Sequence, residues 1–232
     1  MSDLSNPTPL AVEKQTRETR FLAPYRYHAL VDEICQFRWP DIDQQELTNV
    51  AWVYYYFSVQ FRECLEAACA AFPDDALLRE LDCAERNTDN LSPWPGVARP
   101  GELLNHDEFM RRTLQLSHID EGRRLRLDAI GVAYLTKTRS IDRNARIKSL
   151  ATYEDGGLEM VFRSILRAHD WRGPLLQAFR HFLVEHIKFD SDPEHGHGAI
   201  CRHLAPDDSV MPLWSAFRDM LVAAVPKLAE PE

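Results

Sequence analysis

Apolar residues recur every three or four positions along most of the chain, which is the period of a helix that buries one face. The longest such stretch opens at Asp43 or Gln44 and ends at Pro73, and its apolar stripe begins with Val50 and Val53. Alternating apolar and polar runs of useful length are missing from the sequence, as are Asn-Gly turns, so we expect no β-strands. The pattern therefore predicts an all-α fold.

Further helices are expected on the same grounds, each bounded by a capping residue, a proline or a polar loop. They cover residues 25–37, 75–87, 105–116, 121–138, 142–171, 179–192 and 209–228. Residues 1–22 are polar and predict a flexible leader. The remaining residues, 23–232, are expected to form a single domain, a bundle of about seven helices whose long members bury their stripes against each other.

Composition narrows the class of protein. With 232 residues the chain can bury one sizeable core, and its net charge of -9 argues against a nucleic-acid binder, which needs a basic stripe. No apolar run approaches the roughly 18 residues of a membrane span, and the N-terminus lacks an apolar signal core. We therefore expect a cytoplasmic protein that binds neither nucleic acid nor membrane. The five cysteines include no C-x-x-C pair, so neither a disulfide framework nor a thiolate zinc site is predicted.

Residues of metal-ligand type gather around a forced helix break late in the chain. His186 and Asp190 lie four residues apart on the apolar face of a predicted helix. Buried imidazole and carboxylate groups must be paired, hydrogen-bonded or bound to a metal, because an uncompensated buried charge is costly. Pro193 then interrupts the helix, and His195 and His197 follow at once. This segment is predicted to form one wall of a metal site.

Three other helices also carry a metal-type residue where an apolar residue belongs. Glu85 extends a stripe of leucines, His106 shares a face with apolar neighbours, and Glu154 interrupts another apolar stripe. Gly156 and Gly157 follow in mid-helix, where each costs about 1 kcal/mol relative to alanine, so we expect another group to approach closely there. Carboxylate and imidazole ligands without thiolate suit Fe or Mn better than Zn or Cu(I). The competing interpretation is a set of buried polar networks.

The order of these residues resembles the heme-oxygenase-like diiron oxidases, which share a seven-helix bundle with heme oxygenase, thiaminase II and the pyrroloquinoline-quinone synthase. The family's motif is an early glutamate and histidine, a glutamate after a tyrosine in a mid-chain helix, then His-x-x-x-Asp followed shortly by His-Gly. The resemblance covers roughly residues 45–205. The residues that match the motif are Glu85, His106, Glu154, His186, Asp190 and His197.

The resemblance implies a site for two Fe(II) ions per chain, with O2 as co-substrate and an external electron donor. Glu154 and Asp190 would bridge or chelate the irons, and His106, His186 and His197 would be terminal nitrogen donors. It further implies a small-molecule substrate, amino-acid-derived or fatty-acid-like, that undergoes N-oxygenation or oxidative C–C cleavage in natural-product metabolism. A homodimer is expected from the fold relatives alone.

Two departures from the family's pattern leave alternatives among the ligands. Family members usually hold the early glutamate and histidine within about two helical turns, whereas here a proline-rich loop separates Glu85 from His106. Asp89 or Glu108 could therefore take one of those places. Glu159 is a further alternate, although it falls off its stripe.

The second departure concerns the final histidine, because both His195 and His197 precede a glycine. An unbroken helix would put His197 roughly 16 Å from His186, too far to share a metal pair, so the break at Pro193 must fold the segment back. We prefer His197, since its Gly-Ala-Ile continuation resembles the family's sequence, and we keep His195 as the alternate.

Aromatic residues supply candidates for the walls of a substrate pocket. Tyr54, Tyr55 and Tyr56 wrap most of a helix circumference, so at least one ring should face inward. Trp94 stands between two prolines in a long loop, residues 88–101, of a kind typical of a lid or pocket wall. For the tyrosines the alternative is ordinary core packing.

Other functions fit parts of the same pattern. A cofactor-free oxidase of the quinone-synthase type would use the same residues as acid–base groups around a bound aromatic substrate. A thiaminase-like hydrolase would need an activated cysteine, and none of the five lies beside the polar cluster in sequence. A non-catalytic helical binding protein would bind no iron, and a heme oxygenase would depend on His28 alone.

Overall fold

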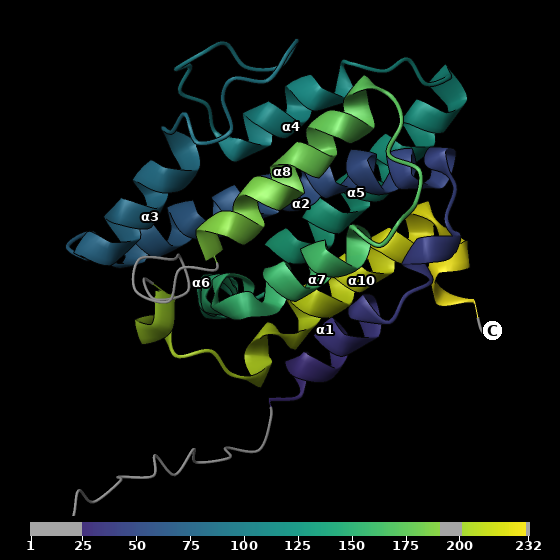
Figure 1. Ribbon diagram of the computed structural model, residues 1–232. Coiled ribbons are helices and arrows are strands. Elements are labelled where there is room, and N and C mark those ends of the chain that lie inside the picture. The colour runs from purple at the N-terminus through teal and green to yellow at the C-terminus, as the bar shows by residue number, and fades with distance from the viewer. Residues whose placement is uncertain (1–24, 191–200, 231–232) are drawn as a thin grey trace, which may run out of the picture.

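The computed structural model describes residues 25–190 and 201–230, and these ranges form helices and connecting loops without a β-strand (Figure 1). The all-α prediction is confirmed, whereas the expected leader at 1–22 lies outside the described residues. The α-helices in these ranges are α1 (Tyr27–Cys35), α2 (Gln44–Ala71), α3 (Ala76–Arg86), α4 (His106–Leu114), α5 (Glu121–Arg139), α6 (Arg143–Thr152), α7 (Leu158–Ile165), α8 (Pro174–Asp190) and α10 (Met211–Ala224). Short 3₁₀ turns lie at Trp39–Asp41, Arg202–Leu204, Asp208–Val210 and Pro226–Ala229. Within the described part of the chain, no helix is long and apolar enough to cross a membrane.

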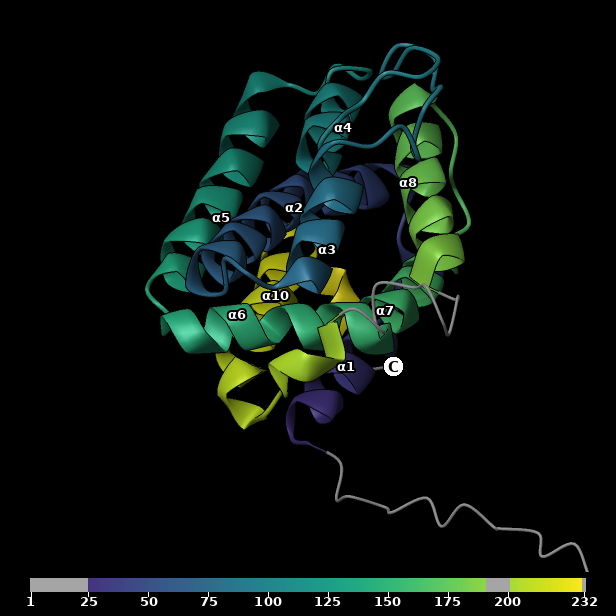
Figure 2. The same ribbon diagram turned by 90° about the vertical axis from the view of Figure 1, so that its left-hand side faces the viewer.

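Helix α2 runs through the middle of the bundle and organises the core. It contacts α3, α4, α5, α6, α8 and α10, and Figure 2 shows α5 and α8 on opposite sides of it. Asp43 fixes its start, because the Asp43 carboxylate accepts a hydrogen bond from the Glu46 amide while the Glu46 carboxylate accepts one from the Asp43 amide. The predicted apolar stripe of this helix is buried; its residues are Val50, Val53, Phe57, Phe61 and Leu65.

The helix expected over 142–171 is divided, and this division is one reason why the described residues contain more helices than predicted. A π-helical turn, Tyr153–Gly157, separates α6 from α7. Gly156 takes a φ of 91°, which side chains with a Cβ rarely adopt. A Cβ built on Gly157 would overlap the carbonyl oxygen of Thr152 and touch the Trp214 ring. The two glycines therefore permit a wide turn, and Glu154 lies within it.

Helices α2 and α5 approach each other closely at a glycine. A Cβ on Gly131 of α5 would overlap the ring of Tyr56 from α2. The Tyr56 hydroxyl donates a hydrogen bond of 2.9 Å to Asp128, which also accepts one of 2.8 Å from the Trp52 indole. Tyr56 therefore packs between the two helices and serves as a structural residue of the α2–α5 contact.

Replacing Gly131 with alanine is expected to lower the free energy of unfolding by about 1–3 kcal/mol, because the Tyr56 ring must move and strain its bond to Asp128. Urea unfolding measures this effect. Gly122→Ala is the matched control, since its Cβ would meet nothing closer than 3.4 Å at the start of the same helix. Equal urea midpoints for the two variants would contradict the close packing of α2 against α5.

Candidate metal centre

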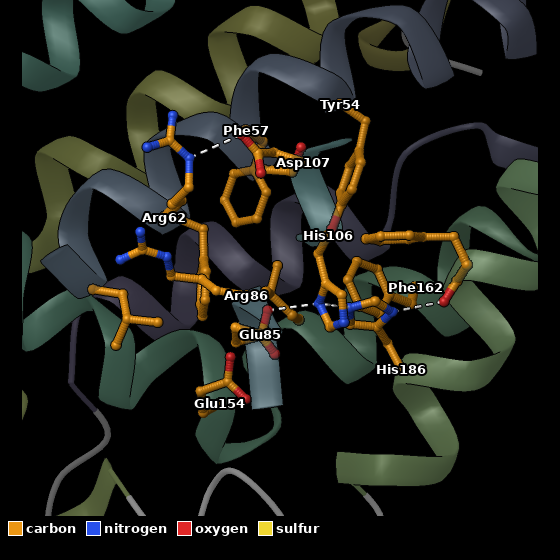
Figure 3. A pocket seen from close by; sticks show the side chains of 15 residues that line it. Tyr54, Phe57, Arg62, Glu85, Arg86, His106, Asp107, Glu154, Phe162 and His186 are labelled. Carbon is orange, nitrogen blue, oxygen red and sulfur yellow. Dashed lines mark hydrogen bonds and ion pairs between the residues drawn. The ribbon is translucent and has the colours of Figure 1, made fainter. Parts of the chain in front are cut away.

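Three helices bring two histidines and one glutamate to a single point. Glu85 lies in the last turn of α3, His106 is the first residue of α4, and His186 lies in the second half of α8. One ligand atom from each lies within 4.8 Å of the other two (Figure 3). The His106 Nδ1 atom is 2.6 Å from the Glu85 Oε2 atom and 3.0 Å from the His186 Nε2 atom. Glu85 and His106 are each only 6% exposed, so solvent screens this cluster weakly.

The hydrogen bonds of His186 show which of its ring nitrogens faces the cluster with a lone pair. Its Nδ1 atom lies 2.7 Å from the backbone carbonyl oxygen of Phe182. A carbonyl oxygen can only accept, so Nδ1 carries the hydrogen and Nε2 of the neutral ring is an acceptor. Two acceptors, one from Glu85 and one from His186, thus face the same nitrogen of His106, which can offer at most one hydrogen. A cation at this point could take one ligand atom from each of the three residues.

Glu154 lines the same cavity from the π-helical turn. It is 6% exposed, and in Figure 3 it lies below Glu85 on the side away from His186. Its carboxylate is not part of the group formed by Glu85, His106 and His186 within the described residues. Glu154 therefore adds a second buried carboxylate to the wall of the cavity.

The cavity around these polar groups is mostly apolar. Its accessible volume is about 30 Å³, which is room for a water molecule or an ion and lies well below the usual volume of small-molecule sites. The His186 ring packs on the Phe182 ring with centroids 4.0 Å apart. Apolar side chains from α2, α7 and α8 form the remaining walls: Phe57, Phe61, Leu65, Leu158, Phe162 and Phe182. Such walls hold the polar cluster in a medium of low dielectric constant.

Charged residues stand at the side of the cavity nearest α3 and α4. Arg62 of α2 donates to Asp107 at 2.9 Å and to Glu66 at 2.8 Å. Burial lowers the pKa of Arg62, but these carboxylates outweigh burial and raise the pKa overall. Arg86 pairs with Asp82 at 3.1 Å, close to the same group. The Arg62–Asp107 pair ties α2 to α4 next to His106.

The four aromatic residues predicted to line a pocket take different places. Tyr54 is 2% exposed and lines the cavity. Tyr55 is half-buried with its ring against Tyr56, which faces α5 as described above. Trp94 stacks on His181 of α8, with ring centroids 4.4 Å apart. Of these four residues, Tyr54 alone is among those that line the cavity in the described part of the chain.

The alternate ligands in the described residues are placed elsewhere. Glu108 pairs with Arg111 and Arg112, and its bond to Arg111 lowers the pKa of Glu108 to about 2. Glu159 pairs with Arg163 at 2.6 Å, and Asp89 is exposed in a loop. None of the three contributes to the cluster among the described residues.

The late motif is only partly described. Asp190 ends α8, and its backbone alone is described. His195 and His197 lie outside the described residues. The assignment of these three as ligands stays a prediction.

Cysteine chemistry is absent from the described cavity wall. Cys64 is fully buried between α2 and α6, and burial raises its pKa to about 11. A thiol in that state is a poor nucleophile. The described cavity wall therefore lacks the activated cysteine that a thiaminase-like hydrolase would need.

Neither a scan against models of known protein families nor a search of the curated proteins finds a match to this chain. The function of this chain is therefore inferred from the side chains that line the cavity.

Proposed function

We propose that the protein is a non-heme iron oxidase or oxygenase that acts on a small molecule with O2. The observation that carries this proposal is the convergence of Glu85, His106 and His186 in a buried cavity. Two imidazoles and one carboxylate are the ligand set of many non-heme Fe(II) oxygenases. The family resemblance implies a second iron, which would be bound by Glu154, Asp190 and either His197 or His195.

The cavity supports an oxidative role through the residues that surround the cluster. The Phe182 carbonyl holds the His186 ring in the orientation that points Nε2 at the cluster. Tyr54 and the phenylalanine walls give the cavity an apolar lining, which a substrate would contact once the cavity widens to admit it. Bound iron would supply the reduction of O2 and the oxidation of the substrate, with electrons from an external donor.

An anaerobic titration of the metal-free protein with Fe(II), followed by an O2 pulse under stopped-flow absorbance, tests this function. We expect saturation near two irons per chain and a transient visible band after O2. Saturation at one iron per chain would support binding by Glu85, His106 and His186 and would contradict a second iron site. A chain that binds no iron contradicts the proposal, and its polar cluster would then be a buried network, as in a helical binding protein.

Zn²⁺ and a chelator complete the test. Zn²⁺ also accepts two histidines and one glutamate, so a parallel titration shows whether the site prefers iron. Oxygen consumption that continues in chelator would point to the cofactor-free oxidase. Loss of oxygen consumption in chelator, with recovery on adding Fe(II), is the expected result.

A further inference from the structure

The loop between α3 and α4, residues 87–105, contacts both helices that carry the cluster's histidines; we call it the α3–α4 loop. Asn90 of this loop places its Oδ1 atom 3.2 Å from the His106 Nε2 atom. The next residue, Leu91, places its carbonyl oxygen 3.2 Å from the His181 Nε2 atom of α8. Trp94 stacks on the same His181 ring at an interplanar angle of 18°. Figure 2 shows this loop beside the ends of α4 and α8.

The Asn90 contact matters because a metal binds only the ring nitrogen that carries no hydrogen. In His106 the nitrogen that faces Glu85 and His186 is Nδ1. For Nδ1 to bind a metal, the hydrogen of the neutral ring must lie on Nε2. A hydrogen on Nε2 needs an acceptor in this partly buried place, and the Asn90 carbonyl oxygen is positioned to accept it.

We propose that Asn90 is a positioning residue, which holds His106 in the tautomer whose Nδ1 atom can bind a metal ion. This inference rests on the proposed metal centre. Without a metal, the Nδ1–H of His106 can donate to Glu85, and the Asn90 amide can turn its NH2 group toward Nε2. An asparagine therefore serves both tautomers, whereas an aspartate can only accept and favours the metal-binding one.

The anchoring of the loop explains how Asn90 keeps its place. The Leu104 amide donates to the Thr88 carbonyl at 2.9 Å, which closes the loop at its base. Arg112 of α4 donates to the Val97 carbonyl at 3.0 Å. With the Trp94 stack on α8, these contacts fix the loop to the helices that carry His106 and His186. Trp94 thus helps to fix the loop to α8 and is not among the described residues that line the cavity.

Three variants isolate the role of Asn90. Asn90→Leu keeps much of the side-chain volume but removes the acceptor, and it is expected to weaken metal binding by about 10–100-fold, the range for outer partners of ligating histidines. Asn90→Asp keeps the acceptor and is expected to bind at least as tightly as the wild type. Asp89→Ala is the matched control, because Asp89 is the exposed neighbour in the same loop.

The measurement uses Zn²⁺ alone as a diamagnetic probe on the full chain. A competition titration with a chromophoric chelator gives the affinity, and ¹⁵N spectra of labelled histidines give the tautomer of His106, assigned by loss of its signals in His106→Gln. We expect zinc on Nδ1 and the hydrogen on Nε2 in the wild type, and a loss of this pattern in Asn90→Leu. Equal affinity and an unchanged pattern in Asn90→Leu would overturn the inference while leaving the metal centre standing.

Measurements on the metal-free protein distinguish failure of the proposed metal centre from failure of the proposed role of Asn90. If the wild type binds neither Fe(II) nor Zn²⁺, the proposed function fails. The ¹⁵N spectra of the metal-free wild type and Asn90→Asp still decide the role of residue 90, since the aspartate is expected to move the hydrogen of His106 to Nε2. Identical spectra for these two proteins would overturn the inference.

Discussion

Replacing Glu85 with glutamine is expected to lower the affinity for Fe(II) by more than about 100-fold, beyond the loss seen for outer partners of ligands. Glutamine has nearly the same size and can still accept a hydrogen bond from His106, so the packing of α3 should survive. What it lacks is the negative charge that a divalent cation needs in a buried site. An anaerobic competition titration with Fe(II) measures the change.

Glu80 offers a matched control for this prediction. It lies on the same helix but is exposed, so Glu80→Gln removes the same charge from α3 without reaching the cavity. Urea unfolding of both metal-free variants checks that the fold is intact. If Glu85→Gln and Glu80→Gln bind Fe(II) alike, Glu85 is not a ligand, and the cluster is a buried hydrogen-bonded network.

Replacing Phe182 with alanine is expected to lower the free energy of unfolding by about 3–5 kcal/mol, the usual cost of removing a buried phenylalanine. Phe182 is 1% exposed, and its ring packs on His186 and against Tyr54. The cavity left behind would also release the His186 ring from one of its two contacts with residue 182, the other being the carbonyl. Denaturant unfolding followed by circular dichroism measures the loss.

Phe72 provides the comparison for Phe182, because it lies just past the end of α2 and is 48% exposed. Phe72→Ala is expected to change the unfolding free energy by about 0.5 kcal/mol or less. Phe182→Leu, a milder variant, keeps enough folded protein for metal titration should the alanine variant not fold. Similar losses of unfolding free energy for Phe182→Ala and Phe72→Ala would contradict the packing of Phe182 in the core.

The starts of α2, α3 and α6 could be predicted because their causes are local in sequence, whereas α8 begins at Pro174, earlier than the residue 179 expected. Asp43, Asp75 and Asp142 each precede an apolar stripe, and each carboxylate accepts hydrogen bonds from the first amides of its helix. Glu85 and His106 could also be predicted from local sequence, since a polar residue on an apolar stripe stands out against its neighbours. Both are buried as that position implies.

Other features could not be predicted because their causes lie in tertiary contacts. Tyr54, Tyr55 and Tyr56 together cover most of the α2 circumference, so the sequence alone could not say which ring faces the cavity. Asn90 lies in a loop, where no period marks one polar residue as different from the next. The π-helical turn could not be predicted because the apolar stripe over 142–171 fits the 3.6-residue period of one continuous helix, although its two glycines indicate a close approach.

The π-helical turn gives this segment one residue more than a continuous α-helix would need. Each residue of an α-helix advances the chain by about 100°, and the wider π-helical turn absorbs this extra rotation, so α6 and α7 keep their faces despite the added residue. Deleting Gly156 would let the two helices join as one α-helix with Val161 and Phe162 still in the core. Glu154 would lose the turn that now presents it to the cavity. The added residue thus lets one stretch of chain keep its apolar face inward and still deliver a carboxylate to the cavity.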